Sequence, residues 1–279
     1  MRREGMQDER SDVASARLRT VAVRDNAEWC DAMARAHGRR GQFSAMYWLC
    51  GEPMPQHFPN VVTIGRDVRS QRGQHEAIAR LAAAGLPRGW AVKDSYACLD
   101  LTMLGFRALL DAEWYARMPG PIVQPQPAGS APLEVAVVRG SEAFAAWVAA
   151  WRAATSPAAT PAVAAPMAKR GGRAASAKAH AASVFPLRLL DDPSVRIVSA
   201  RDAERVRAGL VAMLGGSVIG ISNAFGSADG VDACIAALAR GAPQATLVGW
   251  GDETELAQRI AFGFRALGRL RIWVEHRRG

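Results

Sequence analysis

Residues 217–274 read SVIGISNAFGSADGVDACIAALARGAPQATLVGWGDETELAQRIAFGFRALGRLRIWV, and this stretch decides the fold class of the chain. Short runs rich in Val, Ile and Trp alternate in it with longer runs whose apolar residues recur at helical spacing. The pattern predicts strands and helices in turn, with strands at 217–225, 244–251 and 265–276 and helices at 231–241 and 253–263. Such alternation is typical of an α/β domain built on one sheet.

The same alternation extends toward the N-terminus over both halves of the chain. In the second half it predicts strands at 132–140, 195–202 and 207–214, and a helix at 141–154. In the first half it predicts strands at 43–50, 60–65, 90–95 and 107–116, and helices at 26–38, 75–85 and 96–104. Asn26 is the expected N-cap of the first of these helices.

One pentapeptide occurs twice. Gly105–Leu109 and Gly263–Leu267 both read GFRAL, and each lies where the last helix of its half meets the last strand. An acid stands eleven residues before each glycine, Asp94 in the first half and Asp252 in the second. We interpret the repeated sequence, together with the repeated order of elements, as an internal duplication with one copy in each half.

The second half resembles the GNAT superfamily of acyl-CoA-dependent N-acyltransferases. The resemblance rests on the element order from Ser217 to Val274, and above all on Ile260-Ala261-Phe262-Gly263-Phe264, which is similar to the helix-Gly-Phe-strand element that closes the family's fold. It covers 132–279 in full and the later elements of the first half. It implies an α/β fold of the α+β type, with a mixed sheet and tandem GNAT-like domains of which the N-terminal copy is abridged.

This division assigns each part of the chain a role. We expect a disordered N-terminus at 1–18, the abridged GNAT-like domain at 19–118, a Pro/Gly-rich linker at 119–131 and the second GNAT-like domain at 132–279. Within the second domain, 155–183 consists mainly of Ala, Pro, Gly and Ser, and it has no acidic residue and no amphipathic period. Such a composition predicts a disordered insert.

The resemblance also implies a function, which is transfer of an acetyl or other acyl group from acyl-CoA to the amine of a small molecule or a protein. In such a fold the pyrophosphate binds backbone N–H groups at the start of the helix after the fourth strand, and the thioester lies between two parallel strands that splay apart. The cofactor-binding residues that the resemblance implies are Ser222, Asn223, Phe225, Gly226, Gly230 and Asp252. It assigns no catalytic residue.

Three departures from the family's pattern lead to a second hypothesis. The expected phosphate loop, 226–230, lacks the [QR]-x-x-G-x-[GA] signature, and Asp229 within it would repel a phosphate. Arg259 stands where the family often has a tyrosine that protonates the leaving thiolate. Asp252 replaces the usual asparagine. The alternative is therefore a catalytically silent GNAT-fold module that binds a ligand or a partner.

The positive charge of the chain favours an anionic partner. The formal net charge is +9 and the sequence pI is about 10.2. Four of the excess cations lie in 155–183, so nucleic-acid binding, a third hypothesis, rests on charge alone and is disfavoured. Three others, Arg66, Arg69 and Arg72, lie within 65–74 before a predicted helix. They suit a polyphosphate or form a solvated basic loop, and both readings stay open.

The cysteines and the N-terminus complete the expectations. Cys30, His37, Cys50 and His57 repeat a Cys-to-His step of seven residues, but compact C-x(2–4)-C spacing is absent and we predict no metal site. The cysteines are far apart, as expected of reduced thiols. No apolar run approaches the roughly 20 residues that span a bilayer, and the N-terminus has no apolar h-region. We therefore expect a cytoplasmic protein with no membrane partner.

Overall fold

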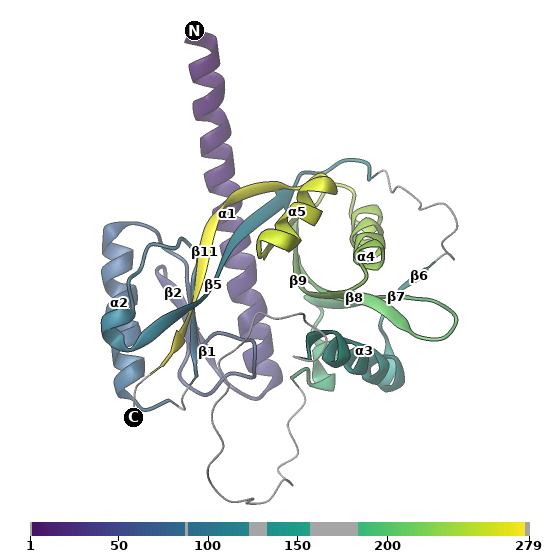
Figure 1. The fold of residues 1–279 in the computed structure, drawn as a ribbon, viewed down its shortest axis with the longest axis horizontal. Helices are drawn as coiled ribbons and strands as arrows, with labels where there is room; N and C mark the ends of the chain where they lie inside the picture. The colour runs from purple at the N-terminus through teal and green to yellow at the C-terminus, as the bar shows by residue number, and fades with distance from the viewer. Residues whose placement is uncertain (1, 87–88, 123–132, 157–183, 277–279) are drawn as a thin grey trace, which may run out of the picture.

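A computed structural model describes residues 2–86, 89–122, 133–156 and 184–276. Eleven strands in this part of the chain form a single sheet, with helices on both of its faces (Figure 1). The helices are α1 (Arg2–Ala36), α2 (Val68–Ala83), α3 (Gly140–Thr155), α4 (Ala228–Gly241) and α5 (Glu253–Ala261), with short 3-10 helices η1 (Thr102–Leu104) and η2 (Leu187–Asp191). The strands are β1 (Gly41–Phe43), β2 (Tyr47–Cys50), β3 (Val61–Thr63), β4 (Ala91–Asp94), β5 (Phe106–Arg117), β6 (Glu134–Val137), β7 (Val195–Arg201), β8 (Val206–Gly215), β9 (Val218–Gly226), β10 (Thr246–Gly251) and β11 (Arg265–Glu275).

The arrangement of the strands is nearly symmetric about the centre of the sheet. The strand order runs β1-β2-β3-β4-β11-β5-β10-β9-β8-β7-β6. The long strands β11 and β5 form an antiparallel pair at the centre. On one side β4 pairs antiparallel with β11, and on the other β10 pairs antiparallel with β5. Beyond these lie β3, parallel to β4, and β9, parallel to β10. The two halves of the chain therefore repeat one arrangement on either side of the centre.

The final strand of each half is inserted into the other half. β5, from the first half, lies between β10 and β11, whereas β11, from the second half, lies between β4 and β5. Each repeated GFRAL begins at a glycine in the left-handed region, Gly105 at φ 81° and Gly263 at φ 86°, just before the exchanged strand. The two copies of the motif thus make the same chain reversal at equivalent places in the sheet.

Helices cover the two faces of the sheet unequally. α1 and α3 pack on one face around the buried Trp29 and Trp147, which share a core with strand residues such as Val211. α2, α4 and α5 lie on the other face, where α4 buries Ile235 against Leu247 and α2 buries Ile78 against Val92. α1 runs across the sheet and contacts strands from both halves (Figure 1). Among the described residues, no helix combines the length and apolar character needed to cross a membrane.

The mixed sheet and the α/β class are as the sequence predicts, but the start of the chain is not. Residues 2–18, for which the sequence predicts disorder, belong to α1. Alanines and long unbranched side chains, which favour helix, continue the helical pattern toward the N-terminus from Arg19. Asn26 consequently lies in the middle of α1, where it is buried, and is not an N-cap.

Two other predicted helices differ from those observed. Residues 96–104 form a turn followed by η1, because the Asp94 carboxylate accepts from the Leu99 amide at 2.8 Å and such bonds compete with helix. α2 begins at Val68, seven residues before its predicted start, because Asp67 caps it by accepting from the Ser70 amide at 2.9 Å. Most of the predicted linker and of the predicted insert lies outside the described residues, at 123–132 and 157–183.

Candidate functional site

The parallel strands β9 and β10 separate partway along their length. Their pairing runs from Val218 with Thr246 to Gly220 with Val248. Beyond Gly220, β9 continues to Gly226 on the β8 side, and β10 continues to Gly251 on the β5 side. The two strands therefore splay apart toward their carboxyl ends, while each stays paired with its other neighbour in the sheet.

A β-bulge gives β9 its direction at this point. Phe225 pairs with Gly209 and Ser222 with Val211, so Asn223 and Ala224 together face a single residue of β8. Asn223 has a φ of 53°, a left-handed conformation that Asn tolerates better than most residues. Its side-chain oxygen accepts from the Trp29 indole at 3.0 Å, which ties the bulge to α1. Bulges of this kind redirect backbone and side chains toward a site.

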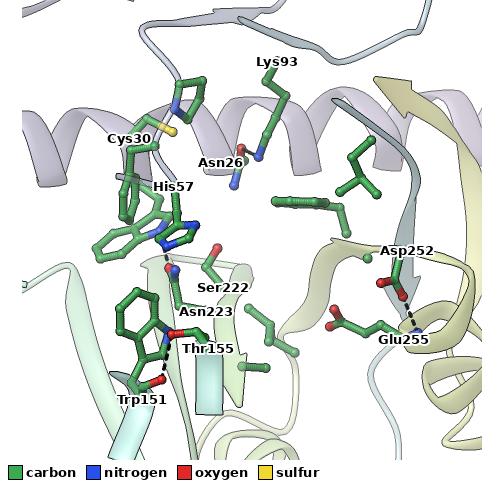
Figure 2. Close-up of a pocket in the computed structure, with 18 residues that line it drawn as sticks. Asn26, Cys30, His57, Lys93, Trp151, Thr155, Ser222, Asn223, Asp252 and Glu255 are labelled. Atoms are coloured by element: carbon green, nitrogen blue, oxygen red, sulfur yellow. Dashed lines mark hydrogen bonds between the residues drawn. The ribbon is translucent and has the colours of Figure 1, made fainter. Parts of the chain in front are cut away.

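A cavity of about 480 Å³ opens between the splayed strands and α1. β9 supplies Ser222, Asn223 and Ala224, and Trp250–Asp252 line it at the end of β10. The N-terminal half of the chain supplies the opposite walls from α1, β4 and the loop at 57–59. Figure 2 shows these side chains converging on one space. The cavity thus lies between the two halves and needs residues from both.

Lys93 is the most deeply buried charged side chain of the cavity wall. It is 3% exposed, and its ammonium donates to the Asn26 side-chain oxygen at 2.7 Å. The Nζ atom lies 3.9 Å from the centroid of the Trp250 ring. Burial lowers the pKa of Lys93 to about 8, while the nearby Cys30 thiol acts in the opposite direction. An amide oxygen and an aromatic face thus surround this cation.

Two acids of the C-terminal half enter the cavity. Asp252 caps α5 by accepting from the Glu255 amide at 2.9 Å, and Glu255 accepts from the Tyr115 hydroxyl at 2.9 Å. Burial raises the pKa of Glu255, against the hydrogen bond from Tyr115 and the charge of Arg259, which lower it. Tyr115 comes from the exchanged strand β5, so the first half positions an acid of the second.

The remaining walls are largely aromatic. Trp29, Phe58, Trp151 and Trp250 line the cavity, and the His57 ring meets Trp151 edge to face at a centroid distance of 5.7 Å. Burial lowers the pKa of His57, which favours its neutral form. The cavity therefore combines apolar surface with a few polar groups, as small-molecule sites do.

The structure places three of the six predicted binding residues in this cavity. Ser222, Asn223 and Asp252 line it, whereas Phe225 packs against Trp147 at a centroid distance of 5.2 Å. Gly226 has a φ of 97°, and a Cβ there would clash with the Arg207 carbonyl oxygen. Phe225 and Gly226 thus have clear packing and backbone roles. Whether any of the six binds a cofactor stays a prediction.

The helix start at the predicted phosphate loop is partly self-capped. α4 begins at Ala228, so Asp229 and Gly230 belong to its first turn and not to a loop. The Ser227 hydroxyl accepts from the Gly230 amide at 3.3 Å, which leaves fewer free N–H groups for a phosphate. Arg259, at the position of the family's tyrosine, is 2% exposed and pairs with Asp232 at 2.8 Å. It therefore has a structural partner within the fold.

The arginine loop of the first half is closed by its own contacts. Gln74 donates to the carbonyl oxygens of Met46 at 2.8 Å and Gly65 at 2.7 Å, and Asp67 already caps α2. Arg69 lies in the first turn of the helix and Arg72 follows it on α2, so neither lies in a loop before it. The structure does not bring these arginines into the cavity between β9 and β10.

The cysteine and histidine residues that repeat at seven-residue steps are not gathered at one point. Cys30 lines the cavity, and burial raises its pKa to about 11, so the thiol stays protonated near neutral pH. A ring nitrogen of His37 lies 3.0 Å from the Val184 carbonyl oxygen. Among the described residues, no three His, Cys, Asp or Glu side chains cluster as metal ligands do.

Sequence reasoning missed Lys93, Asn26 and His57 as cavity residues. Lys93 lies in a predicted strand, WAVKDS, where a lysine reads as an exposed residue of an alternating pattern. A charged residue in a strand that is buried on both faces is a signal of a functional site, and it could have identified Lys93. The sequence does not show that β4 is buried on both faces, because α1 covers one of them. The predicted helix start at Asn26 concealed the length of α1.

Comparisons with known proteins bear on the fold. No protein-family profile matches the sequence. No curated protein matches it either. A solved GCN5-related N-acetyltransferase from Kribbella flavida is 15% identical, with a TM-score of 0.54 over 91% of this chain and 95% of that one. A GNAT-family acetyltransferase from Novosphingobium aromaticivorans is 11% identical, with a TM-score of 0.47 over 89% and 96%.

A third similar structure is a tandem GNAT protein from the clavulanic acid biosynthesis pathway. It is 12% identical, with a TM-score of 0.49 over 81% of this chain and 77% of that one. At such identities the likeness concerns the fold, and the Kribbella flavida structure, with its TM-score above 0.5, carries it. The chain has the GNAT fold.

Proposed function

We propose that the protein is an acyl-CoA-dependent N-acyltransferase whose site is the splay between β9 and β10. The observation that carries this proposal is the end of the strand pairing at Gly220 and Val248, beyond which the cavity opens. A thioester can enter such a gap, and a backbone N–H of a strand that no longer pairs with its neighbour can polarise the carbonyl. The fold shared with N-acetyltransferases supports acetyl-CoA as the acyl donor. The cytoplasmic location remains a prediction.

The reaction requires two proton movements besides the attack. The acceptor nitrogen forms a bond to the thioester carbon, the carbon–sulfur bond breaks, the amine loses a proton and the departing thiolate gains one. Glu255 is our candidate for the group that receives the amine proton. It lines the cavity, and burial raises its pKa toward the range in which a carboxylate is an effective base. The acceptor is a small-molecule or protein amine.

Specific observations favour a second candidate function, which is a catalytically silent module that binds a ligand or a partner. Arg259 replaces the family's tyrosine and is held by Asp232, so it offers no proton to a thiolate. The Ser227 cap and Asp229 also reduce the attraction of the start of α4 for pyrophosphate. These features weaken catalysis while leaving the cavity intact.

Two measurements on the full chain separate the candidates. Calorimetric titration with acetyl-CoA tests binding, and thiol release from acetyl-CoA across a panel of amines tests turnover. The acyltransferase proposal expects both. Binding without thiol release would favour the silent module, and absence of binding at millimolar acetyl-CoA would overturn the acyltransferase proposal.

A further inference from the structure

The cavity contains a buried cation that lacks an anionic partner. Lys93 has three N–H donors, and one of them is used by Asn26. Among the ion pairs of the described residues, none includes Lys93, and its other close neighbours are the aromatic rings of Trp250 and Trp114. Buried charges in proteins are normally paired with an opposite charge or with several hydrogen bonds. An anion in the cavity would supply both.

The position of Lys93 limits where that anion can come from. The side chain extends from β4 toward the cavity, and two of its neighbours, Asn26 on α1 and Trp250 on β10, line the same space (Figure 2). Cys30 faces it from α1 but is held as a neutral thiol by its raised pKa. The partner is therefore expected to enter from the cavity.

The acids of the cavity lie apart from Lys93. Figure 2 shows Lys93 entering from one side, and Asp252 and Glu255 from another. A ligand that extends between them meets a cation at one end and carboxylates at the other. A molecule with an amine and a carboxylate matches that separation of charge, whereas an uncharged or purely cationic amine leaves Lys93 unpartnered.

We infer that Lys93 and Asn26 form a carboxylate-binding subsite, and that the acceptor is an amino carboxylate whose amine faces Glu255. This inference rests on the proposed function for the role of the amine, but not for the binding of the carboxylate. The aromatic walls formed by Trp29 and Trp151 accommodate the apolar part of such a ligand. Substrate selection then depends on a residue of the first half, while the acyl donor binds the second.

The experiment measures binding to the full chain, with and without CoA. The probes are glycine, β-alanine, γ-aminobutyrate and the standard L-amino acids, each compared with its carboxamide. Thermal shift and the fluorescence of the cavity tryptophans report binding. At least one amino carboxylate should bind about tenfold more tightly than its amide, a difference of about 1.4 kcal/mol.

Three variants test whether Lys93 causes that preference. Lys93→Met removes the cation, and Asn26→Asp supplies a carboxylate from within the protein, so both should reduce the preference for carboxylate over amide to near onefold. Asn26→Leu removes the other member of the subsite but keeps the cation, so it should reduce the preference less than Lys93→Met does. If Lys93→Met does not fold, Asn26→Asp tests the same point.

Failure of the inference can be distinguished from failure of the proposed function. If acetyl-CoA binds but no amino carboxylate does, or if the preference survives in Lys93→Met, the subsite is wrong and the acyltransferase proposal stands. If a carboxylate preference depends on Lys93 while acetyl-CoA does not bind, the subsite stands and the acyltransferase proposal is wrong.

Discussion

The sheet contains two parallel strand pairs at equivalent places, β3 with β4 and β9 with β10, and the space beyond each pair differs. Beyond β9 and β10 the structure has a cavity. Beyond β3 and β4 the Ser95 amide donates to the Thr63 hydroxyl at 2.8 Å, and the Ser95 carbonyl accepts from the Trp114 indole at 2.8 Å. Arg19 of α1 also donates to that carbonyl, at 3.1 Å.

This difference shows how one arrangement of strands can serve two purposes. In the first half, short polar contacts close the gap, and β4 supplies Lys93 to the other half's cavity. In the second half, the bulge at Asn223 directs the backbone away and leaves room for a ligand. A duplicated unit can keep its topology while one copy becomes structural and the other remains open.

The largest expected effect comes from blocking the open gap. Ser222→Trp places an indole at the cavity wall and should eliminate the response to acetyl-CoA in calorimetry and thermal shift, because the thioester can no longer enter. The matched control removes Arg66, Arg69 and Arg72 together by substitution with Ala, and should leave binding unchanged. If Ser222→Trp still binds acetyl-CoA and the triple arginine variant does not, the phosphates bind at the arginines of the first half, and the first half contains the donor site.

Breaking the contacts between α2 and the segment that follows β3 should affect stability and not ligand binding. Gln74 is fully buried, and Gln74→Leu removes its hydrogen bonds to the Met46 and Gly65 carbonyl oxygens. We expect the free energy of unfolding to fall by about 1–3 kcal/mol, measured by urea denaturation. Acetyl-CoA affinity should remain that of the parent chain. A weaker affinity would show that the first half also contributes to the donor site.

The contact between Asp25 of α1 and Gly220 of β9 predicts that the stability of the protein depends on pH. Burial, with Glu28 as a second cause, raises the pKa of Asp25 to about 8, although the Gly220 amide donates to its carboxylate. Because the folded state holds this proton more tightly than the unfolded state, stability should fall as pH rises from about 4 to about 8. Asp25→Asn removes the titrating group and should flatten this part of the profile.

Thermal unfolding across that pH range checks the prediction. Asp12→Asn, at an exposed position on the same helix, is the control and should keep the slope of the parent chain. A slope that Asp25→Asn leaves unaltered would contradict the raised pKa of Asp25.

The smallest expected effect concerns the contact between the exchanged strand and the open gap. Tyr115→Phe removes the hydroxyl that donates to Glu255, and this hydrogen bond lowers the pKa of Glu255. Its loss should raise that pKa further and move the acidic limb of the pH profile for thiol release to higher pH. An unchanged pH profile in Tyr115→Phe would show that the hydrogen bond from Tyr115 does not affect the pKa of Glu255.

The sequence predicted the parts of the fold that depend on local patterns. Alternating apolar residues around Ile221 and Leu247 identified β9 and β10, and the repeated GFRAL identified two equivalent chain reversals, since glycine accommodates the left-handed conformation that both require. Ser222 and Asn223, polar residues late in an apolar strand, line the cavity in the structure.

The sequence could not predict features that depend on long-range packing. Nothing in the pattern around Phe106 indicates that β5 pairs with β10 and β11, because strand partners are chosen by contacts between distant segments. Lys93 and Asn26 come into contact only because α1 crosses the sheet, so the sequence around either residue alone does not predict a site. Residues 2–18 read as polar and irregular, yet they continue α1.

The exchange of β5 and β11 also affects the order in which the chain can fold. β5 ends at Arg117, but both strands that flank it, β10 and β11, are made of residues from Thr246 onward. During synthesis, the central strand β5 therefore stays without its sheet neighbours until the residues from Thr246 onward have left the ribosome. Pairing of distant segments is slow and exposes strand edges to association with other chains. We expect a chain that stops after Arg117 to aggregate instead of folding as an independent domain.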